Sequence, residues 1–338
     1  MSTTVSVIIP AYNAGKHIEE CLASVCGQSH RELQILVHDD GSKDDTAEKL
    51  KAFAEKDSRI EVSGGENGGV SKARNICMEK IRGEYFVFLD SDDTLAADAI
   101  EKLLETRAET GMSLIAADRA LVSEDGRVRE RRPGAVREKL DEKKALRDLC
   151  SGRYCLQSAC HKLFSTGVFG DIRFDEDISN GEDRLFVYRC IKRCRELYYL
   201  PLPLWQVRER GDSVSRSPLN SRWMTMLTAM DRMTDIEEDP EIKQRFRASA
   251  LELAVLYIAA YISRRSSDPD FLRALRQRVR HDLKNCRITG AKNRSTDGNG
   301  SDHKLIPISR HDRSWAFICA YFPAPLIALY QRLRGRKE

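Results

Sequence analysis

Three carboxylates stand within four residues at Asp90-Ser91-Asp92-Asp93. They follow the apolar run at residues 86–89, whose aromatic and branched side chains predict a buried strand. Carboxylates this close repel one another and raise at least one pKa unless a cation shares them. Mg²⁺ and Mn²⁺ suit such a position, because they take a few carboxylate oxygens together with the phosphate oxygens of a substrate. The alternative is an acidic turn that caps the next helix.

Strands and helices are expected to alternate through the first 118 residues. Strands are predicted at residues 5–9, 34–38, 60–62, 86–89 and 113–117, and apolar spacing of three and four residues predicts helices between them. Pro10 is expected to close the first strand because it has no N–H. This alternation predicts a parallel sheet with right-handed crossovers, which binds ligands at the carboxyl ends of its strands. Residues 10–13, 39–40 and 90–93 follow strand ends and are expected to converge.

Composition limits the class of protein. The 338 residues are 41% hydrophobic and 32% charged, which predicts a globular chain of one large domain with an appendage, or of two domains. A net charge of +4 with interleaved signs does not favour nucleic acid. We expect no signal peptide, and the ten cysteines are then free thiols in the reducing cytoplasm. Cys150, Cys155 and Cys160 lie near His161, but without C-x-x-C spacing zinc is disfavoured.

Three other nucleotide-handling or phosphate-handling classes fit poorly. The glycine run at residues 64–69 is interrupted by Glu66 and Asn67, so it is not the G-x-G-x-x-G of dinucleotide oxidoreductases. No G-x-x-x-x-G-K-[ST] phosphate loop occurs. A receiver-type phosphoacceptor domain fits only the first part of the chain, and it leaves the acidic triplet overcharged for one phosphoryl site.

Taken together, the motifs resemble those of the family-2 glycosyltransferases of GT-A fold, over roughly residues 5 to 215. The matching stretches are residues 5–13 (VSVIIPAYN), 39–46 (DDGSKDDT), 68–75 (GGVSKARN), 90–93 (DSDD), 161–164 (HKLF), 171–174 (DIRF) and 181–186 (GEDRLF). The resemblance implies an α/β fold with a Rossmann-like, mostly parallel sheet flanked by helices. It implies a glycosyltransferase domain at residues 1–215, with a nucleotide-sugar half at 1–118 and an acceptor half at 119–215. A helical region follows at 216–338.

The resemblance implies a donor site for a nucleoside-diphosphate sugar, with UDP favoured. Asp40 matches the position that accepts a hydrogen bond from the base; its alternative, a cap for the next helix, fits Asp44 better. Asp92, with Asp90 or Asp93, is expected to hold a divalent metal and the diphosphate. The remaining donor-site candidates are Pro10, Tyr12, Arg74, Arg208 and Ser213.

Arg74, Arg208 and Ser213 carry their own alternatives. Arg74 is expected to reach the base or the diphosphate, unless it is an exposed helix arginine. Arg208, Arg210 and Ser213 resemble a flexible loop that closes over the donor diphosphate, although loops of this composition are often only solvated.

Asp183 matches the general base of the family, and neighbouring Glu182 is expected to raise the pKa of one of the two. One base without a second nucleophile predicts a single displacement with inversion at the anomeric carbon. The alternative is a capping box, with Asn180 as N-cap and Asp183 as the third helical residue. The competing functions are a non-catalytic sugar-nucleotide or carbohydrate-binding module and a nucleotidyltransferase.

The segment between residues 118 and 160 is expected to help form the acceptor wall. It should hold a hairpin around Asp125-Gly126 and a charged helix from about residue 141 to 150.

The region after residue 220 is expected to be helical. Residues 246–262 predict a buried or dimer-forming helix, and residues 290–304 a polar linker. Residues 315–330 are apolar but too short and proline-interrupted to span a bilayer, and arginines flank them. This basic and aromatic tail suits the inner face of the cell membrane, where it would bring the enzyme to a lipid-linked acceptor. The alternative is a terminal helix packed on its own core or on a twin subunit.

Overall fold

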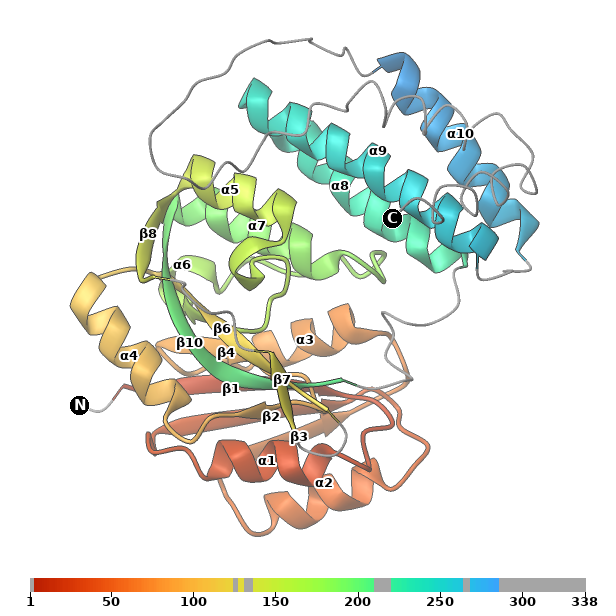
Figure 1. The fold of residues 1–338 in the computed structure, drawn as a ribbon. Coiled ribbons are helices and arrows are strands. Elements are labelled where there is room, and N and C mark those ends of the chain that lie inside the picture. The colour runs from red at the N-terminus through yellow and green to blue at the C-terminus, as the bar shows by residue number, and fades with distance from the viewer. Residues whose placement is uncertain (1–2, 124–126, 131–135, 210–219, 264–267, 286–338) are drawn as a thin grey trace. The chain divides into compact units, whose positions relative to one another are not determined.

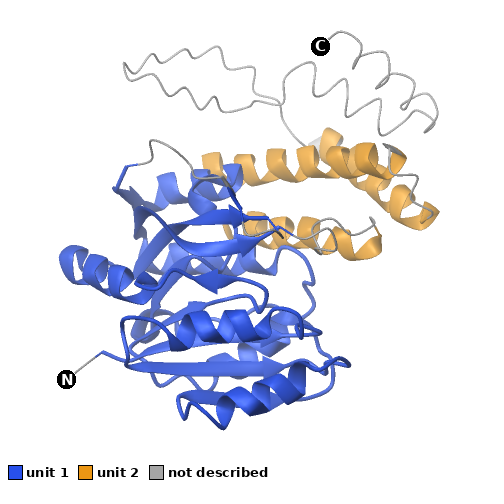
Figure 2. Ribbon diagram, turned by 60° about the horizontal axis from the view of Figure 1, so that its bottom comes forward, with its two compact units in different colours: residues 1–217 blue, residues 218–338 orange. Residues whose placement is uncertain are grey.

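The computed structural model describes residues 3–123, 127–130, 136–209, 220–263 and 268–285, and it divides the chain into two compact units, residues 1–217 and 218–338 (Figures 1 and 2). The strands are β1 (Val5–Ala11), β2 (Leu33–Asp39), β3 (Ile60–Gly64), β4 (Tyr85–Phe88), β5 (Thr94–Leu95), β6 (Leu114–Val122), β7 (Val128–Glu130), β8 (Glu138–Asp141), β9 (Lys162–Ser165) and β10 (Glu196–Arg208). The helices are α1 (Ile18–Cys26), α2 (Thr46–Ala54), α3 (Val70–Met78), α4 (Ala99–Thr110), α5 (Glu142–Ser151), α6 (Thr166–Phe169), α7 (Glu182–Cys194), α8 (Met224–Ile236), α9 (Pro240–Ser263) and α10 (Pro269–Asn285).

The strands of the first unit form one mixed sheet in the order β3-β2-β1-β4-β9-β6-β10-β5, with β7 beside β6 and β8 beside β10. The first four strands of this order are parallel, as predicted. β9 then runs antiparallel between β4 and β6, and it joins the nucleotide half of the sheet to the remainder. The mostly parallel α/β fold expected from the sequence is confirmed.

The first strand extends one residue past Pro10, contrary to the expectation that this proline closes it. Pro10 lies opposite His38 of β2, whereas the pairing of β1 with β4 ends at Ile8. Because Pro10 lies beyond the last pair with β4, its missing N–H costs no ladder bond on that side.

Alternate residues of β1 point into two different cores. Val5, Val7 and Ile9 belong to a core with the apolar faces of α1, α2 and α4. On the other face α3 packs against β1 and β2. There, four buried rings from Phe88, Phe164, Phe174 and Phe186 make stacked and edge-to-face contacts. Helices therefore cover both faces of the parallel part of the sheet.

The hairpin and the charged helix predicted between residues 118 and 160 are both present. β6 and β7 pair antiparallel through Leu121 and Glu130, while the turn predicted at Asp125-Gly126 lies outside the described residues. α5 begins after Asp141, whose carboxylate accepts a hydrogen bond from the Lys144 amide at 2.7 Å.

The second unit contains α8, α9 and α10, with α9 in contact with the other two. Arg278 of α10 binds both carboxylate oxygens of Asp231 on α8, at 2.6 and 2.7 Å, and Asp282 one turn along at 2.8 Å. Within the described ranges, no helix is both long enough and apolar enough to cross a membrane. The predicted linker and the basic tail lie outside the described residues.

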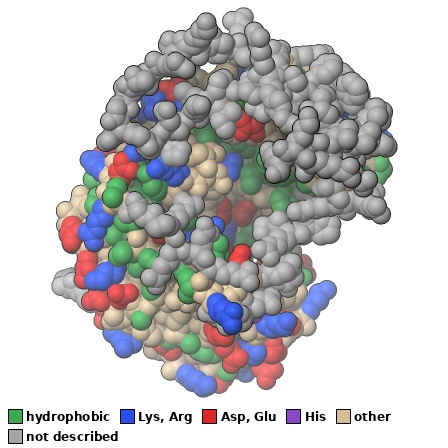
Figure 3. All heavy atoms as spheres, in the orientation of Figure 1, with side chains coloured by type: hydrophobic (Ala, Val, Ile, Leu, Met, Phe, Trp, Pro, Cys, Tyr) green, Lys and Arg blue, Asp and Glu red, His purple; other side chains and the backbone are tan. Residues whose placement is uncertain are grey.

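The charge pattern on the first unit agrees with the sequence. In the lower part of Figure 3, acidic and basic side chains of the first unit are intermixed.

Candidate active site

The carboxyl ends of β1, β2 and β4 lie at one edge of the sheet because these strands run parallel in register. Pro10 is buried in β1 near this edge, and the Tyr12 side chain, just past it, is about half exposed. Asp40 and the acidic stretch follow the ends of β2 and β4. The structure therefore brings together the strand ends that the sequence singled out.

Asp40 is buried, and its carboxylate binds the glycine run at residues 64–69, called here the glycine loop. Its two oxygens accept hydrogen bonds from the Gly68 and Gly69 amides, each at 2.8 Å. These amides stand at the N-terminus of α3, where a negative charge is favourable. Asp40 does not cap α2, whose N-cap is Asp45 without a side-chain cap bond; Asp44, one residue before that N-cap, accepts from the Thr46 amide at 3.1 Å.

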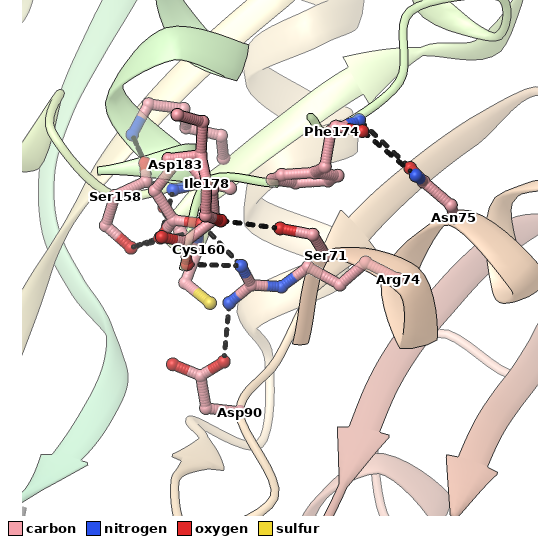
Figure 4. A network of polar contacts seen from close by, with 12 residues as sticks. Ser71, Arg74, Asn75, Asp90, Ser158, Cys160, Phe174, Ile178 and Asp183 are labelled. Atoms are coloured by element: carbon pink, nitrogen blue, oxygen red, sulfur yellow. Dashed lines mark hydrogen bonds and ion pairs between the residues drawn. The ribbon is translucent and has the colours of Figure 1, made fainter. Parts of the chain in front are cut away.

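Arg74 of α3 connects the two halves of the site. Its guanidinium donates to Asp90 at 3.0 Å, to Asp183 at 2.5 Å and to Glu182 at 3.3 Å (Figure 4). The side chain is only 3% exposed, so the alternative of an exposed helix arginine is wrong. The planar guanidinium presents several donors at fixed angles, which lets one residue bind three carboxylates. One buried cation thus joins the acid after β4 to the acid pair at the start of α7.

Asp183 is held from two sides. Arg74 binds one of its carboxylate oxygens, and the other accepts hydrogen bonds from the Ser158 hydroxyl at 3.3 Å and the Ala159 amide at 3.1 Å. Gly181, with φ +94°, is the N-cap of α7 and makes no side-chain cap bond. The predicted capping box is therefore wrong: Asp183 is the second residue of the helix, and its oxygens bind groups outside it.

Glu182, beside Asp183 in the chain, has a raised pKa. Burial, and next the charge of Asp183, raise the pKa of Glu182 to about 7, although Arg74 opposes the shift. Its side chain is 13% exposed. In this pair, the carboxylate of Asp183 binds strong hydrogen-bond donors, and the carboxyl of Glu182 has a pKa near neutral pH.

The three acids after β4 have different surroundings. Asp90 binds Arg74, Asp92 is half-buried in the same turn, and Asp93 is buried and accepts from the Arg208 amide at 3.0 Å. Burial, followed by the charges of Asp90 and Asp92, raises the pKa of Asp93 to about 8. Within the described part of the chain, no three carboxylate, histidine or cysteine side chains converge as a metal site, and the eight described cysteines form no disulfide with one another.

The residues predicted to close over the donor are only partly described. The guanidinium of Arg208 pairs with Glu20 on α1, so in this state it lies beside the first helix. Ser213 and Arg210 lie outside the described residues.

Sequence reasoning missed the residues that hold the site together. Ser158 and Ala159, which bind Asp183, lie in no motif. Ser71 and Asn75 flank Arg74 in the chain, and each contacts the segment before α7: the Ser71 hydroxyl donates to the Ile178 carbonyl at 3.3 Å, and the Asn75 side-chain amide to the Phe174 carbonyl at 3.0 Å (Figure 4). Ser71 and Asn75 both lie in the matching stretch at residues 68–75, which could have suggested them.

The sheet order and the edge at which these acids meet define the class of protein, a GT-A glycosyltransferase fold. The structure of S. aureus TarS 1-349 superposes with a TM-score of 0.63 at 18% identity, covering 97% of this chain and 91% of that one. The Pyrobaculum calidifontis mannosyltransferase PcManGT, solved with GDP-Man and Mn²⁺, gives 0.53 at 16% identity, over 95% and 86% of the two chains. These likenesses establish the fold.

The family follows from sequence. The model of glycosyl transferase family 2 matches residues 6–172, and the chain belongs to this family of enzymes. Glycosyltransferase GlyG of Streptococcus pneumoniae is 27% identical over 236 residues, or 66% of this chain and 76% of GlyG. Glycosyltransferase GlyA of the same organism is 29% identical over 243 residues, or 68% of this chain. The chain spans only 34% of GlyA, so GlyA has large parts that this match does not reach.

Proposed function

We propose that this chain transfers a sugar from a UDP-sugar to a hydroxyl group of a glycan or glycolipid, with inversion, in polysaccharide biosynthesis. The observation that carries the proposal is the position of Arg74, which binds Asp90 and Asp183 at 3.0 and 2.5 Å. A donor-side acid and a candidate base are thereby held within reach of one side chain. S. aureus TarS, of the same fold, was solved in complex with UDP-GlcNAc, which supports UDP as the nucleotide.

The proposed chemistry assigns one role to each acid. Asp183 accepts the proton of the acceptor hydroxyl as that oxygen attacks the anomeric carbon. With a pKa of about 7, Glu182 is about half protonated at pH 7, so on average it adds less than a full second negative charge beside the base. Asp40 fixes the glycine loop at the base-binding edge, with Pro10 and Tyr12 beside it.

A divalent cation fits the acids after β4. Repulsion among Asp90, Asp92 and Asp93 contributes to the raised pKa of Asp93, and a cation there would relieve it. Mg²⁺ and Mn²⁺ are commonly held by one or two carboxylates, with phosphate and water as the other ligands, so three converging side chains are not needed. We assign this role to Asp92 with Asp90; the bound cation would stabilise the charge of the departing diphosphate.

Two other functions make different predictions. A non-catalytic sugar-nucleotide or carbohydrate-binding module needs no base, so the hydrogen bonds that orient Asp183 favour an enzyme. A nucleotidyltransferase would release pyrophosphate from a nucleoside triphosphate, which a coupled phosphate assay detects.

Calorimetric binding tests the donor site. UDP, GDP and dTDP are titrated with and without Mn²⁺ into the wild type, Asp92→Ala and the control Asp98→Ala, an exposed aspartate before α4 that makes no side-chain cap bond. We expect UDP binding that needs both Mn²⁺ and Asp92 and is unchanged in the control. Metal-independent binding, or no binding of any diphosphate, would refute the proposed donor site.

The stereochemical outcome tests the assignment of a single base. With a transferable UDP-sugar, proton NMR of the first product should show the anomeric configuration opposite to that of the donor. Retained configuration would contradict a single displacement.

Partners outside the described residues stay predictions. The tail, with Arg310 and Arg313 before its apolar run, is proposed to contact an anionic membrane face near a lipid-linked acceptor, and a homodimer is the alternative use of its apolar surface. A chain truncated after His303 should lose binding to anionic vesicles at unchanged UDP affinity. Unchanged vesicle binding would remove the proposal.

A further inference from the structure

Lys162, the first residue of β9, is buried, and among the described residues no carboxylate pairs with it. Its ammonium donates to the carbonyl oxygens of Cys155, Ser158 and Cys160, at 2.9, 2.5 and 3.3 Å. The residue has no exposed surface, and burial lowers the pKa of Lys162 to about 8. Burying an ammonium costs free energy that only complete hydrogen bonding offsets. The three N–H donors of the ammonium bind three carbonyls, so its hydrogen bonding is complete. Lys162 therefore fixes the backbone of residues 155–160, called here the lysine loop.

The lysine loop is flanked by strained backbone. Tyr154 and Cys155 at its start have φ of +55° and +54°, and His161 after its end has +64°. Residues with a Cβ rarely adopt this left-handed region, because the Cβ then crowds the neighbouring carbonyl. Such strain persists where surrounding interactions impose it, often at functional sites. Here the Lys162 ammonium binds carbonyls at both ends of the loop, those of Cys155 and Cys160.

The same loop faces Asp183 with its donors. The Ser158 hydroxyl and the Ala159 amide donate to one carboxylate oxygen, and the Cys160 amide donates to the Ser158 oxygen at 3.1 Å (Figure 4). The loop carbonyls are thus bound to Lys162, while its amide and hydroxyl groups are bound to the acid.

We infer that Lys162 is a positioning residue for the general base, acting on Asp183 through the lysine loop. The inference rests on the proposed function of Asp183. Arg74 fixes one oxygen of the carboxylate and the loop fixes the other, so the side chain cannot rotate away from an acceptor hydroxyl. No hydrogen bond of Lys162 reaches the acids after β4, so its loss should affect catalysis more than donor binding.

The test compares Lys162→Met and Ser158→Ala with Lys102→Met, the same replacement at a partly exposed lysine on α4. Misplacement of a catalytic group by about an ångström costs ~10²-fold in rate, which is the fall in kcat expected for Lys162→Met, with the Kd for UDP within about twofold. Ser158→Ala should lower kcat by roughly tenfold, because one hydrogen bond to a charged group is lost. Lys102→Met should match the wild type.

The pH profile separates positioning from mere structural support. Donors to a carboxylate stabilise its charged form, so their loss raises the pKa of the base. The acid limb of kcat should therefore move to higher pH in Lys162→Met and in Ser158→Ala. The double variant should be no slower than Lys162→Met, since both changes break one chain of contacts. Additive losses with an unmoved acid limb would overturn the inference.

A second readout does not require turnover. The ¹⁵N amide resonance of Ala159 should follow the ionisation of Asp183 in wild-type protein and stop doing so in Lys162→Met. An Ala159 amide that titrates identically in both proteins would refute the inference even if the enzyme assay had failed. Wild type that binds no UDP, with the expected NMR change present, would refute the proposed function alone.

Discussion

Replacing Glu182 by glutamine should stabilise the protein at and above neutral pH. The folded chain holds this carboxyl in a buried position, which raises its pKa from 4.5 to about 7. The folded state therefore binds more protons than the unfolded state between these two values, so wild-type stability falls as pH rises through this window. Glutamine has no charge to lose, and it retains an oxygen for the contact with Arg74.

The size of the effect follows from the two pKa values. At 1.36 kcal/mol per pKa unit, a rise from 4.5 to about 7 corresponds to about 3 kcal/mol of unfolding free energy. Glu182→Gln and wild type should be nearly equal in stability at pH 4.5, and the variant should gain up to about 3 kcal/mol by pH 8.

Urea unfolding at several pH values measures this difference. Trp205 is fully buried and its indole N–H donates to the Phe88 carbonyl at 3.2 Å, so its fluorescence reports on the first unit. The background Trp223→Phe with Trp315→Phe leaves it as the single tryptophan. Glu79→Gln, at an exposed position, is the control and should give a curve parallel to wild type. If the Glu182→Gln curve is also parallel to wild type, the buried carboxyl does not titrate as reasoned.

Three further changes test other parts of the fold. Asp40→Ala leaves two backbone amides of the glycine loop without an acceptor. It should lower the free energy of unfolding in urea by about 1–3 kcal/mol and weaken UDP binding in calorimetry. Unchanged values would show that the loop keeps its conformation without Asp40. Burial keeps the pKa of His161 well below 6.5, and its ring nitrogens have no partner within the described chain, so the folded state stays neutral where the unfolded state gains a proton. Wild-type stability should then fall below about pH 6.5 by up to 1.4 kcal/mol per pH unit, and His161→Phe should remove that slope; a slope that survives belongs to another group. Gly83→Ala places a Cβ 2.7 Å from the Ser6 amide nitrogen, so it should lower Tm by several degrees. An unchanged Tm would mean that the backbone before β4 moves away from Ser6 of β1 at little cost in free energy.

The sequence was sufficient for the parts of the structure that local patterns determine. The alternation of strand and helix predicted the parallel core, because period and apolar run length depend on neighbouring residues. The convergence of strand ends followed from the direction of parallel strands. Asp40 could be selected in this way, as a position at a strand end, whereas the acid pair was selected through the resemblance to family-2 glycosyltransferases.

Contacts between distant segments account for what the sequence did not show. Asp183 looked like a capping residue because Asn180 stands three positions before it. Its partners are instead Arg74, which lies 109 residues earlier, and the lysine loop, which no periodicity marks. Arg74 itself was ambiguous, since a helix arginine is exposed unless tertiary packing covers it. Such pairings are set by which elements the sheet brings together.

One face of α3 has a consequence for evolution and for engineering. Ser71, Arg74 and Asn75 all bind the stretch from Phe174 to Asp183, across about a hundred residues of sequence. A chimaera that joins this nucleotide half to the acceptor half of another family member would separate partners at all three positions. New acceptor preferences should therefore be easiest to obtain by recombination when α3 is inherited together with the segment it binds, so that helix is the unit to transplant.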